Sequence, residues 1–222
     1  NKQTLYTDSL DYDRLYEFAY FFDGGRLVDG DDKLSSDWGE YSTKTREAVF
    51  YYDVRMRSPD RLIETDTLHY DTRTSVAHIT GKSKITSNQG IIYTDDGFFD
   101  SKQDKARLYN RSTVINEGKT IVGDSLYFDD NTGVAEGFGN VVYIDTQNKN
   151  ELRCGHLNYN KISGYGYATV DALMKDFSQE DTLYLHGDSI KLYTYDINTD
   201  SVYRVVHCFD KVRAYRTDMQ AV

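Results

Sequence analysis

The sequence predicts an all-β fold built from repeats, and three observations support this prediction. A pattern of about 29 residues recurs seven times and fills the chain from end to end. The 222 residues include 20 Tyr but one Trp and one Pro, and tyrosine, valine, isoleucine and threonine suit a pleated, half-buried surface. No stretch shows a sustained 3.6-residue apolar period, so we expect almost no helix.

The repeats align on a position that we call the anchor, an aspartate in six of the seven copies. Steps of 29 residues separate the first five anchors, and steps of 31 and 33 lead to two looser copies: Asp8, Asp37, Asp66, Asp95, Asp124, Gly155 and Asp188. Three residues before the anchor the side chain is always aliphatic: Leu5, Leu34, Ile63, Ile92, Ile121, Leu152 and Leu185. Four residues after the anchor it is large: Tyr12, Tyr41, Tyr70, Phe99, Phe128, Tyr159 and Leu192.

Two further columns lie in the second half of each repeat. Eleven residues after the anchor the side chain is small: Ala19, Ala48, Ala77, Ala106, Ala135 and Gly166. Nineteen residues after it the side chain can face a core: Leu27, Met56, Ile85, Val114, Tyr143 and Met174. Four aligned columns predict that residues 1–222 form one repeat domain.

Each repeat is expected to supply two strands of about ten residues, or about fourteen strands in all. The first strand crosses the anchor, where the apolar positions change parity, as Ile121 and Leu126 illustrate. A strand with one buried face must bend or bulge at such a change. We interpret the anchor aspartates as acceptors of backbone N–H groups at this bend. The second strand starts at the alanine and alternates, as Ala77, Ile79 and Ile85 do.

Short polar links rich in Asp, Ser, Thr, Asn and Gly connect these strands, as Asp71–Ser75 does, and favour antiparallel hairpins. A parallel β-helix is the alternative. If every strand bends at its anchor, the stack becomes a trough with an apolar inside and an unpaired strand at each end. Residues Tyr215–Val222 resemble one further strand with nothing after it, so we expect a fragment of a longer protein that associates end to end.

The formal net charge of −10 argues against nucleic acid and against an anionic membrane surface as partners. The sequence contains no run of 18 apolar residues that could cross a membrane as a helix. Cys154 and Cys208 stand at unrelated positions of the repeat, so we expect them to be unbonded.

The runs Ile121–Phe128 (IVGDSLYF) and Ala135–Val142 (AEGFGNVV) resemble the OstA-like family of LptA-type lipopolysaccharide-transport proteins. The resemblance implies an open, bent antiparallel β-jellyroll in the periplasm that holds lipopolysaccharide acyl chains and stacks end to end with other transport proteins. It implies no catalytic motif and no cofactor. The ligand-lining residues would then come from the apolar columns and their neighbours: Leu34, Ile63, Leu68, Ile85, Ile92, Phe99, Val114, Ile121, Leu126, Phe128 and Leu152.

Four other interpretations compete with a carrier. The aspartate column suggests a metal, but equivalent residues two strands apart lie too far from each other to share an ion. Five histidines fall at unrelated repeat positions, which does not favour catalysis: His69, His78, His156, His186 and His207. A structural solenoid would have a fully packed core, whereas a polysaccharide-processing β-helix enzyme would have a cleft lined by acids and aromatic rings.

Overall fold

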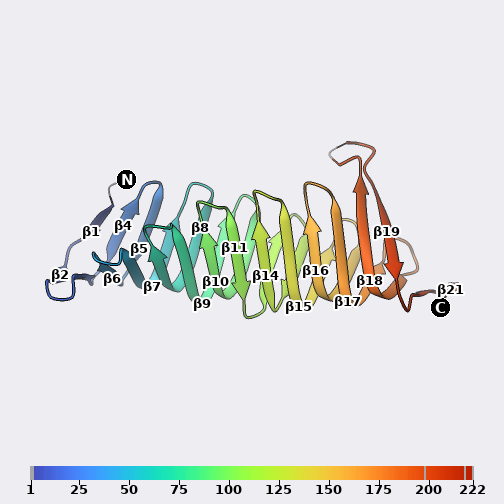
Figure 1. Ribbon diagram of the computed structural model, residues 1–222, viewed down its shortest axis with the longest axis horizontal. Helices are drawn as coiled ribbons and strands as arrows, with labels where there is room; N and C mark the ends of the chain where they lie inside the picture. Colours follow the sequence, from blue (N-terminus) through green and yellow to red (C-terminus); the bar gives the residue numbers. More distant parts are fainter. Residues whose placement is uncertain (1–2, 198, 218, 222) are drawn as a thin grey trace. The chain divides into compact units, whose positions relative to one another are not determined.

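The computed structural model describes residues 3–197, 199–217 and 219–221, and the chain divides into two compact units, residues 1–110 and 111–222. All elements among these described residues are strands (Figure 1). In unit 1 they are β1 (Thr4–Thr7), β2 (Leu10–Asp13), β3 (Phe18–Phe21), β4 (Gly25–Asp29), β5 (Asp32–Ser36), β6 (Trp38–Ser42), β7 (Glu47–Arg57), β8 (Arg61–Asp71), β9 (Val76–Ser87), β10 (Gly90–Asp100) and β11 (Lys105–Tyr109). In unit 2 they are β12 (Ser112–Asn116), β13 (Lys119–Gly123), β14 (Ser125–Asp129), β15 (Val134–Asp145), β16 (Asn150–Asn160), β17 (Tyr165–Asp176), β18 (Leu183–Tyr195), β19 (Tyr203–Phe209), β20 (Arg213–Arg216) and β21 (Met219–Ala221).

Within each unit, neighbouring strands pair antiparallel, and the parallel alternative is wrong. In unit 1, β7 pairs with β8, β8 with β9, and β9 with β10. In unit 2, β15 to β18 pair successively in the same way. The predicted all-β, repeat-built, bent antiparallel fold is confirmed, and short hairpin connections account for it. In the described part of the chain there is no helix long and apolar enough to cross a membrane.

The predicted bend occurs at the anchors. Long strands keep their continuity and shift register, as β8 does between Glu64 and Thr67 around Asp66. Others divide into two strands, as β13 and β14 do at Asp124. The bend therefore turns the expected fourteen or so strands into the 21 strands of the described residues.

The strand beside each anchor bends as well, which the sequence analysis missed. Fifteen or sixteen residues after the anchor, most repeats carry one or two residues with positive φ: Asp23 and Gly24, Tyr52 and Asp53, Gly81, Asn110 and Arg111, Gly139 and Asn140, and Val170 and Asp171. A non-glycine residue in this region costs about 1–3 kcal/mol unless its surroundings hold it there. The anchor backbone supplies that support, because the Asp37 N–H donates to the Tyr52 carbonyl and the Gly24 N–H donates to the Asp37 carbonyl.

In unit 1, a hydroxyl side chain just before the anchor completes the bend. The hydroxyls of Thr7, Ser36, Thr65 and Thr94 each donate to the carbonyl two residues further on. Ser36, Thr65 and Thr94 are buried, so each hydroxyl satisfies a carbonyl that the bend removes from the ladder. In unit 2 the same position holds Gly123 and Cys154.

The predicted role of the aspartate side chains is wrong at Asp124 and Asp188. The Asp124 carboxylate accepts hydrogen bonds from the side chains of Arg111 at 3.0 Å and Asn140 at 2.7 Å. Lys211 lies 3.0 Å from the Asp188 carboxylate. At these two anchors the backbone takes part in the bend, and the carboxylate bonds cationic or amide side chains that lie beside it.

The polar links are turns capped by a side chain five residues after the anchor. The Asp71 carboxylate accepts hydrogen bonds from the N–H groups of Arg73 and Thr74, and Asp100 accepts them from Lys102 and Gln103. Such caps satisfy turn amides locally, which explains the Asp and Asn content of the links. The Arg73 guanidinium also bonds Asp71 and holds the pKa of that carboxyl at about 2.

The final segment differs from the sequence prediction. Instead of one strand over Tyr215–Val222, β20 and β21 form an antiparallel hairpin in which Ala214 lies opposite Ala221. Positions 218 and 222 of the predicted strand lie outside the described residues.

Candidate functional site

The two apolar columns that flank the bend form one continuous row of cross-strand neighbours in each unit. In unit 1 the successive register partners are Leu5, Leu27, Leu34, Met56, Ile63, Ile85 and Ile92. In unit 2 they are Val114, Ile121, Tyr143, Leu152, Met174 and Leu185. The rows follow from the repeat, because equivalent residues on neighbouring strands face each other at every step.

The unit 1 row is sealed. From Leu27 to Ile85 its side chains are no more than 3 % exposed. A second inner row alternates large and small residues, with Gly39 between Phe21 and Phe50. A Cβ atom on Gly39 would lie 2.4 Å from the Phe21 ring, so this row has no spare volume. Unit 1 therefore has a packed core between Leu27 and Ile85.

Polar contacts join the two ends of the bent strands in unit 1. The Tyr70 hydroxyl, at one end of β8, donates to the carboxylate of Asp32 at 3.1 Å and also lies 3.4 Å from Asp29, both beside the β4–β5 turn. Burial raises the pKa of Tyr70 well above its ordinary value, and both aspartates add to the rise, so its hydroxyl stays protonated. Arg61 lies 3.9 Å from Asp104 across the same opening.

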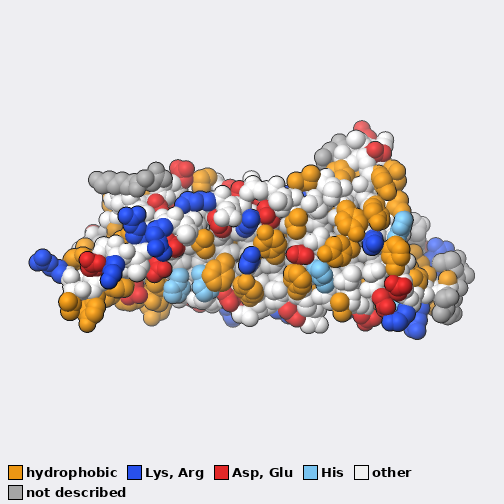
Figure 2. Space-filling view, viewed as in Figure 1, with side chains coloured by type: hydrophobic (Ala, Val, Ile, Leu, Met, Phe, Trp, Pro, Cys, Tyr) orange, Lys and Arg blue, Asp and Glu red, His pale blue; other side chains and the backbone are white. Residues whose placement is uncertain are grey.

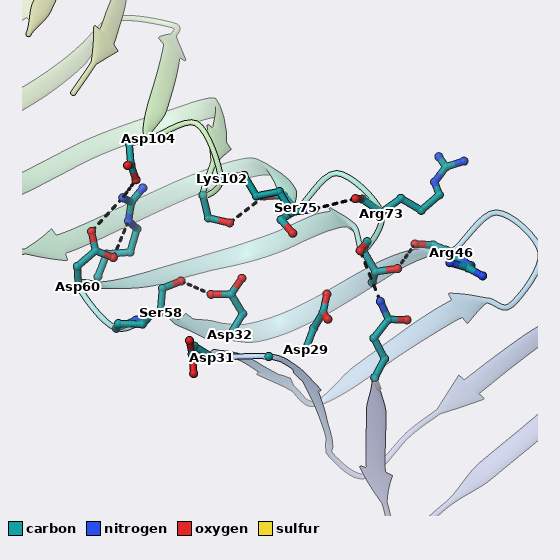
Figure 3. Close-up of a pocket in the computed structure, with 16 residues that line it drawn as sticks. Asp29, Asp31, Asp32, Arg46, Ser58, Asp60, Arg73, Ser75, Lys102 and Asp104 are labelled. Atoms are coloured by element: carbon teal, nitrogen blue, oxygen red, sulfur yellow. Dashed lines mark hydrogen bonds and ion pairs between the residues drawn. The ribbon is translucent and has the colours of Figure 1, made fainter. Parts of the chain in front are cut away.

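A cavity of about 680 Å³ lies at this opening, and its walls are polar. Figure 3 shows Asp29 and Asp32 on one side of the cavity and Ser75 and Arg73 on the other. The Lys102 ammonium donates to the Arg73 carbonyl at 2.8 Å. These charged walls do not suit an acyl chain, which gains free energy from contact with apolar surface.

The unit 2 row is open by comparison. We call its six residues, Val114, Ile121, Tyr143, Leu152, Met174 and Leu185, the apolar seam. All six are partly exposed. Beneath four of them lies a packed cluster of Val141, Cys154, Leu157, Ala168, Ala172 and Ile190. The seam is therefore apolar surface supported by a solid core.

A residue within the seam carries a polar group with a fixed protonation state. Burial raises the pKa of Tyr143 above its ordinary value, and Asp145 adds to this rise. The Tyr143 hydroxyl lies 3.5 Å from the Asp145 carboxylate, which is itself buried. A protonated Tyr143 thus presents a ring to the seam and directs its hydroxyl toward Asp145.

The predicted ligand-lining residues fall into two groups. The structure buries Leu34, Ile63, Leu68, Ile85, Phe99 and Leu126 completely. It leaves Ile92, Val114, Ile121, Phe128 and Leu152 partly exposed. The prediction omitted Tyr143, Met174 and Leu185, although they stand in the same columns and line the same row.

The histidines do not form a shared site. His78, His156 and His186 each contact a separate carboxylate, at 3.0, 3.2 and 2.7 Å. Among the residues that the structure describes, no group of three or more His, Cys, Asp or Glu side chains could hold a metal. Cys154 is buried, Cys208 is partly buried, and both are free thiols.

Fold and site together define a bent, antiparallel repeat protein with an apolar inside, and comparisons with known proteins bear on its family. Residues 1–66 match the family model of OstA-like proteins. This match lies in the first two repeats, and it confirms the resemblance to OstA-like proteins that the sequence shows in the fifth repeat.

Among solved structures, the chain is similar to LptH from Pseudomonas aeruginosa, described as the LptA-homologous periplasmic component of the conserved lipopolysaccharide transport device. The sequence identity is 11%, the TM-score is 0.45, and the match covers 49% of this chain and 82% of LptH. No curated protein matches the chain.

Proposed function

We propose that this protein is a periplasmic, non-enzymatic carrier that holds the acyl chains of lipopolysaccharide against the apolar seam of unit 2. The partly exposed row Val114–Ile121–Tyr143–Leu152–Met174–Leu185 is the observation that carries this proposal. The OstA-like match of residues 1–66 supports it independently.

The seam suits an acyl chain because its residues follow one another at every strand. Neighbouring strands lie about 4.8 Å apart, so six residues form an apolar strip of roughly 24 Å. Burial of apolar surface contributes about 25 cal/mol per Å², and a strip of this length can cover an acyl chain along its side. The anionic sugars would stay outside, away from a protein whose net charge is −10.

A strand at the end of the sheet has one edge that suits assembly with further transport proteins. In the described part of the chain β1 pairs with β4, and its other edge can accept a further strand. A strand edge carries unsatisfied N–H and C=O groups and can extend the sheet of a neighbouring protein. We propose end-to-end contact with other lipopolysaccharide-transport proteins, or with a second copy, through such edges.

A structural solenoid is the second candidate, and unit 1 favours it. The unit 1 row from Leu27 to Ile85 is closed, as a fully packed core would be. The enzyme alternative required a cleft lined by acids and aromatic rings. The two cavities described in unit 1 have acids but no aromatic residue among their described lining residues.

Site-specific photo-crosslinking to labelled lipopolysaccharide tests the carrier. A photoreactive residue at Leu152 or Met174 is expected to crosslink to the lipid, because both positions belong to the seam. Arg153 is the matched control, since it is the next residue on the same strand and is exposed. A photoreactive residue at Ile63 should also fail, because its surroundings are packed.

Two results would contradict the carrier. Equal crosslinking at positions 152 and 153 would show that lipid aggregates coat the surface without using the seam. The absence of any extractable or exchangeable lipid, together with no crosslink at either seam position, would favour the structural solenoid.

A further inference from the structure

The outer face of unit 2 carries aromatic and imidazole rings in continuous contact. The chain of neighbouring rings runs through Phe138, His156, Tyr167, Tyr165, Tyr193, His207 and Phe209, with successive centroids 4.5, 5.5, 6.2, 5.2, 5.3 and 6.2 Å apart. We call these seven residues the aromatic face. They come from β15 to β19, on the side of each strand opposite the inner residues Leu157, Ala168 and Ile190.

The register places these rings in ordered rows with polar side chains between them. One row across five strands is Phe138, His156, Thr169, Ser189 and Phe209. The next row is Glu136, Asn158, Tyr167, Lys191 and His207. Ring surfaces and hydrogen-bonding groups thus lie beside one another over the whole face.

The rings are accessible. Phe138 is 42% exposed and Phe209 is 39% exposed, and His207 is also exposed. Phe138 and His156 stack with their planes only 8° apart and their centroids 4.5 Å apart, so each ring covers one face of the other and leaves its other face for a further contact. Figure 2 shows orange side chains and pale-blue histidines gathered on this side, over the part of the chain that Figure 1 draws in yellow to red.

The charges within the rows nearly cancel. Glu136 and Lys191 are the only acidic and basic side chains of the two rows, all ten of whose residues the structure describes. Glu136 lies 3.2 Å from His156, and the Lys191 ammonium lies 5.0 Å from the Phe209 ring centroid. Charged groups therefore have partners on the face itself, in a protein with a net charge of −10.

We propose that the aromatic face of unit 2 binds an uncharged polysaccharide chain. A sugar ring has an apolar C–H face that packs on an aromatic ring and equatorial hydroxyls that bond polar neighbours such as Glu136, Asn158 and Lys191. The local charge balance matches a neutral ligand, whereas the net charge of −10 repels an anionic polymer. This inference does not depend on lipid binding by the seam.

The spacing of the strands fits such a chain. An extended glycan advances by about 5 Å per sugar, close to the ~4.8 Å between neighbouring strands, so a chain that crosses the strands meets one row position per sugar. An acyl chain would lack partners for the carboxylate, amide and ammonium groups of the second row. A protein interface needs an apolar centre without charges, and here Tyr167 lies between Asn158 and Lys191.

Affinity electrophoresis of the full chain tests the proposal, with gels that contain a soluble neutral polysaccharide from a panel of glucans, mannans and galactans. The parent protein is expected to be retarded by at least one neutral polymer and not by an anionic one such as alginate. The double variant Phe138→Ala with Tyr167→Ala removes two rings that contact His156 and should weaken binding by roughly tenfold or more.

The control is Tyr184→Ala. Tyr184 is an exposed tyrosine on β18, the strand that also carries Tyr193, but it lies on the other side of the bend and contacts Tyr215 instead. The control should bind like the parent. Thermal unfolding of all proteins shows whether they fold, and Phe138→Ser alone replaces the double variant if the latter does not.

Three outcomes would overturn the inference. They are no retardation of the parent by any neutral polymer, equal retardation of parent and ring variant, and equal loss with Tyr184→Ala. Because the probes carry no lipid, failure here leaves the crosslinking result at Leu152 unaffected, and the two proposals can fail separately.

Discussion

The same substitution in one column should have different consequences in the two units. Ile63 and Ile121 both stand three residues before an anchor, but Ile63 is 1% exposed and Ile121 is partly exposed. We therefore compare Ile63→Asp with Ile121→Asp. Lys84→Asp is the surface control, because Lys84 is exposed on the opposite side of its strand from Ile85.

The magnitudes follow from burial. Truncation of a buried isoleucine costs about 2–5 kcal/mol. Holding the new carboxyl neutral at pH 7 costs roughly 4 kcal/mol more, if its pKa rises from ~4 to ~7. The sum of roughly 6–9 kcal/mol is comparable to the ~5–15 kcal/mol stability of a whole domain. Ile63→Asp should therefore unfold unit 1.

Ile121→Asp should cost much less. Its carboxylate can reach water, so it loses only part of the ~1.5–3 kcal/mol that full burial of the side chain contributes. We expect a loss of about 1–2 kcal/mol, together with the loss of lipopolysaccharide binding. Lys84→Asp should change stability by less than about 0.5 kcal/mol and leave binding intact.

Denaturant unfolding and binding of labelled lipopolysaccharide on the same variants make the comparison. In Ile63→Asp, burial raises the pKa of the new carboxyl in the folded state, so its penalty is absent below the unfolded pKa near 4 and grows as the pH rises above it. Equal destabilisation by both variants would refute the distinction between a sealed and an open row.

Four further predictions rest on individual contacts. Tyr70→Phe should cost about 1–2 kcal/mol, and it should reduce the loss of stability above pH 10 that the raised pKa of the buried phenol causes, as pH-dependent unfolding would show. Thiol titration should find two free thiols, with Cys154 slower than Cys208 in the native protein, because burial raises the pKa of Cys154 to about 11. Gly139→Val should cost about 2 kcal/mol or more in denaturant unfolding, because φ is +69° there and a Cβ atom would lie 2.5 Å from the Asp124 carboxylate. Sedimentation should reveal species that grow with concentration through the edge strands, and a strict monomer at high concentration would contradict this.

The period of the sequence was sufficient to predict the ladders of the core. Met56, Ile63 and Ile85 stand in two columns of the repeat, and the structure pairs them in that order. A strand period of two and a repeat of constant length leave little freedom in this register. For the same reason, the bend at Asp66 could be inferred from a change of parity alone.

The partner of each bend was missed, although its signal was present. Gly81, Asn110 and Gly139 recur fifteen residues after the anchor, and glycine and asparagine are the residues that most readily take positive φ. The hydroxyls of Thr65 and Thr94 were also visible as a column beside the anchor. Neither column interrupts the local alternation, so the alternation alone predicts a continuous strand at these positions.

Whether an apolar row is buried or partly exposed could not be predicted from the repeat column that supplies its residues. Closure of the unit 1 opening depends on Tyr70 and Asp29, which are 41 residues apart in sequence, and on Arg61 and Asp104. No repeat position identifies such a pair, because the contact joins opposite ends of bent strands from different repeats. The single domain predicted for residues 1–222 stays a prediction.

The hydroxyl group in one column contributes to the closure of the opening in unit 1. Four residues after the anchor, unit 1 has Tyr41 and Tyr70, whose hydroxyls bond Gln3 and the aspartates beside the β4–β5 turn. The column is mixed in both units, since unit 1 also has Phe99, and unit 2 has Tyr159 together with Phe128 and Leu192. Exchange of one oxygen atom at this column removes a contact across the opening but keeps the apolar ladder below it. The apolar residues thus form the ladder in every copy, and the hydroxyls of Tyr41 and Tyr70 add polar contacts at the rim of unit 1.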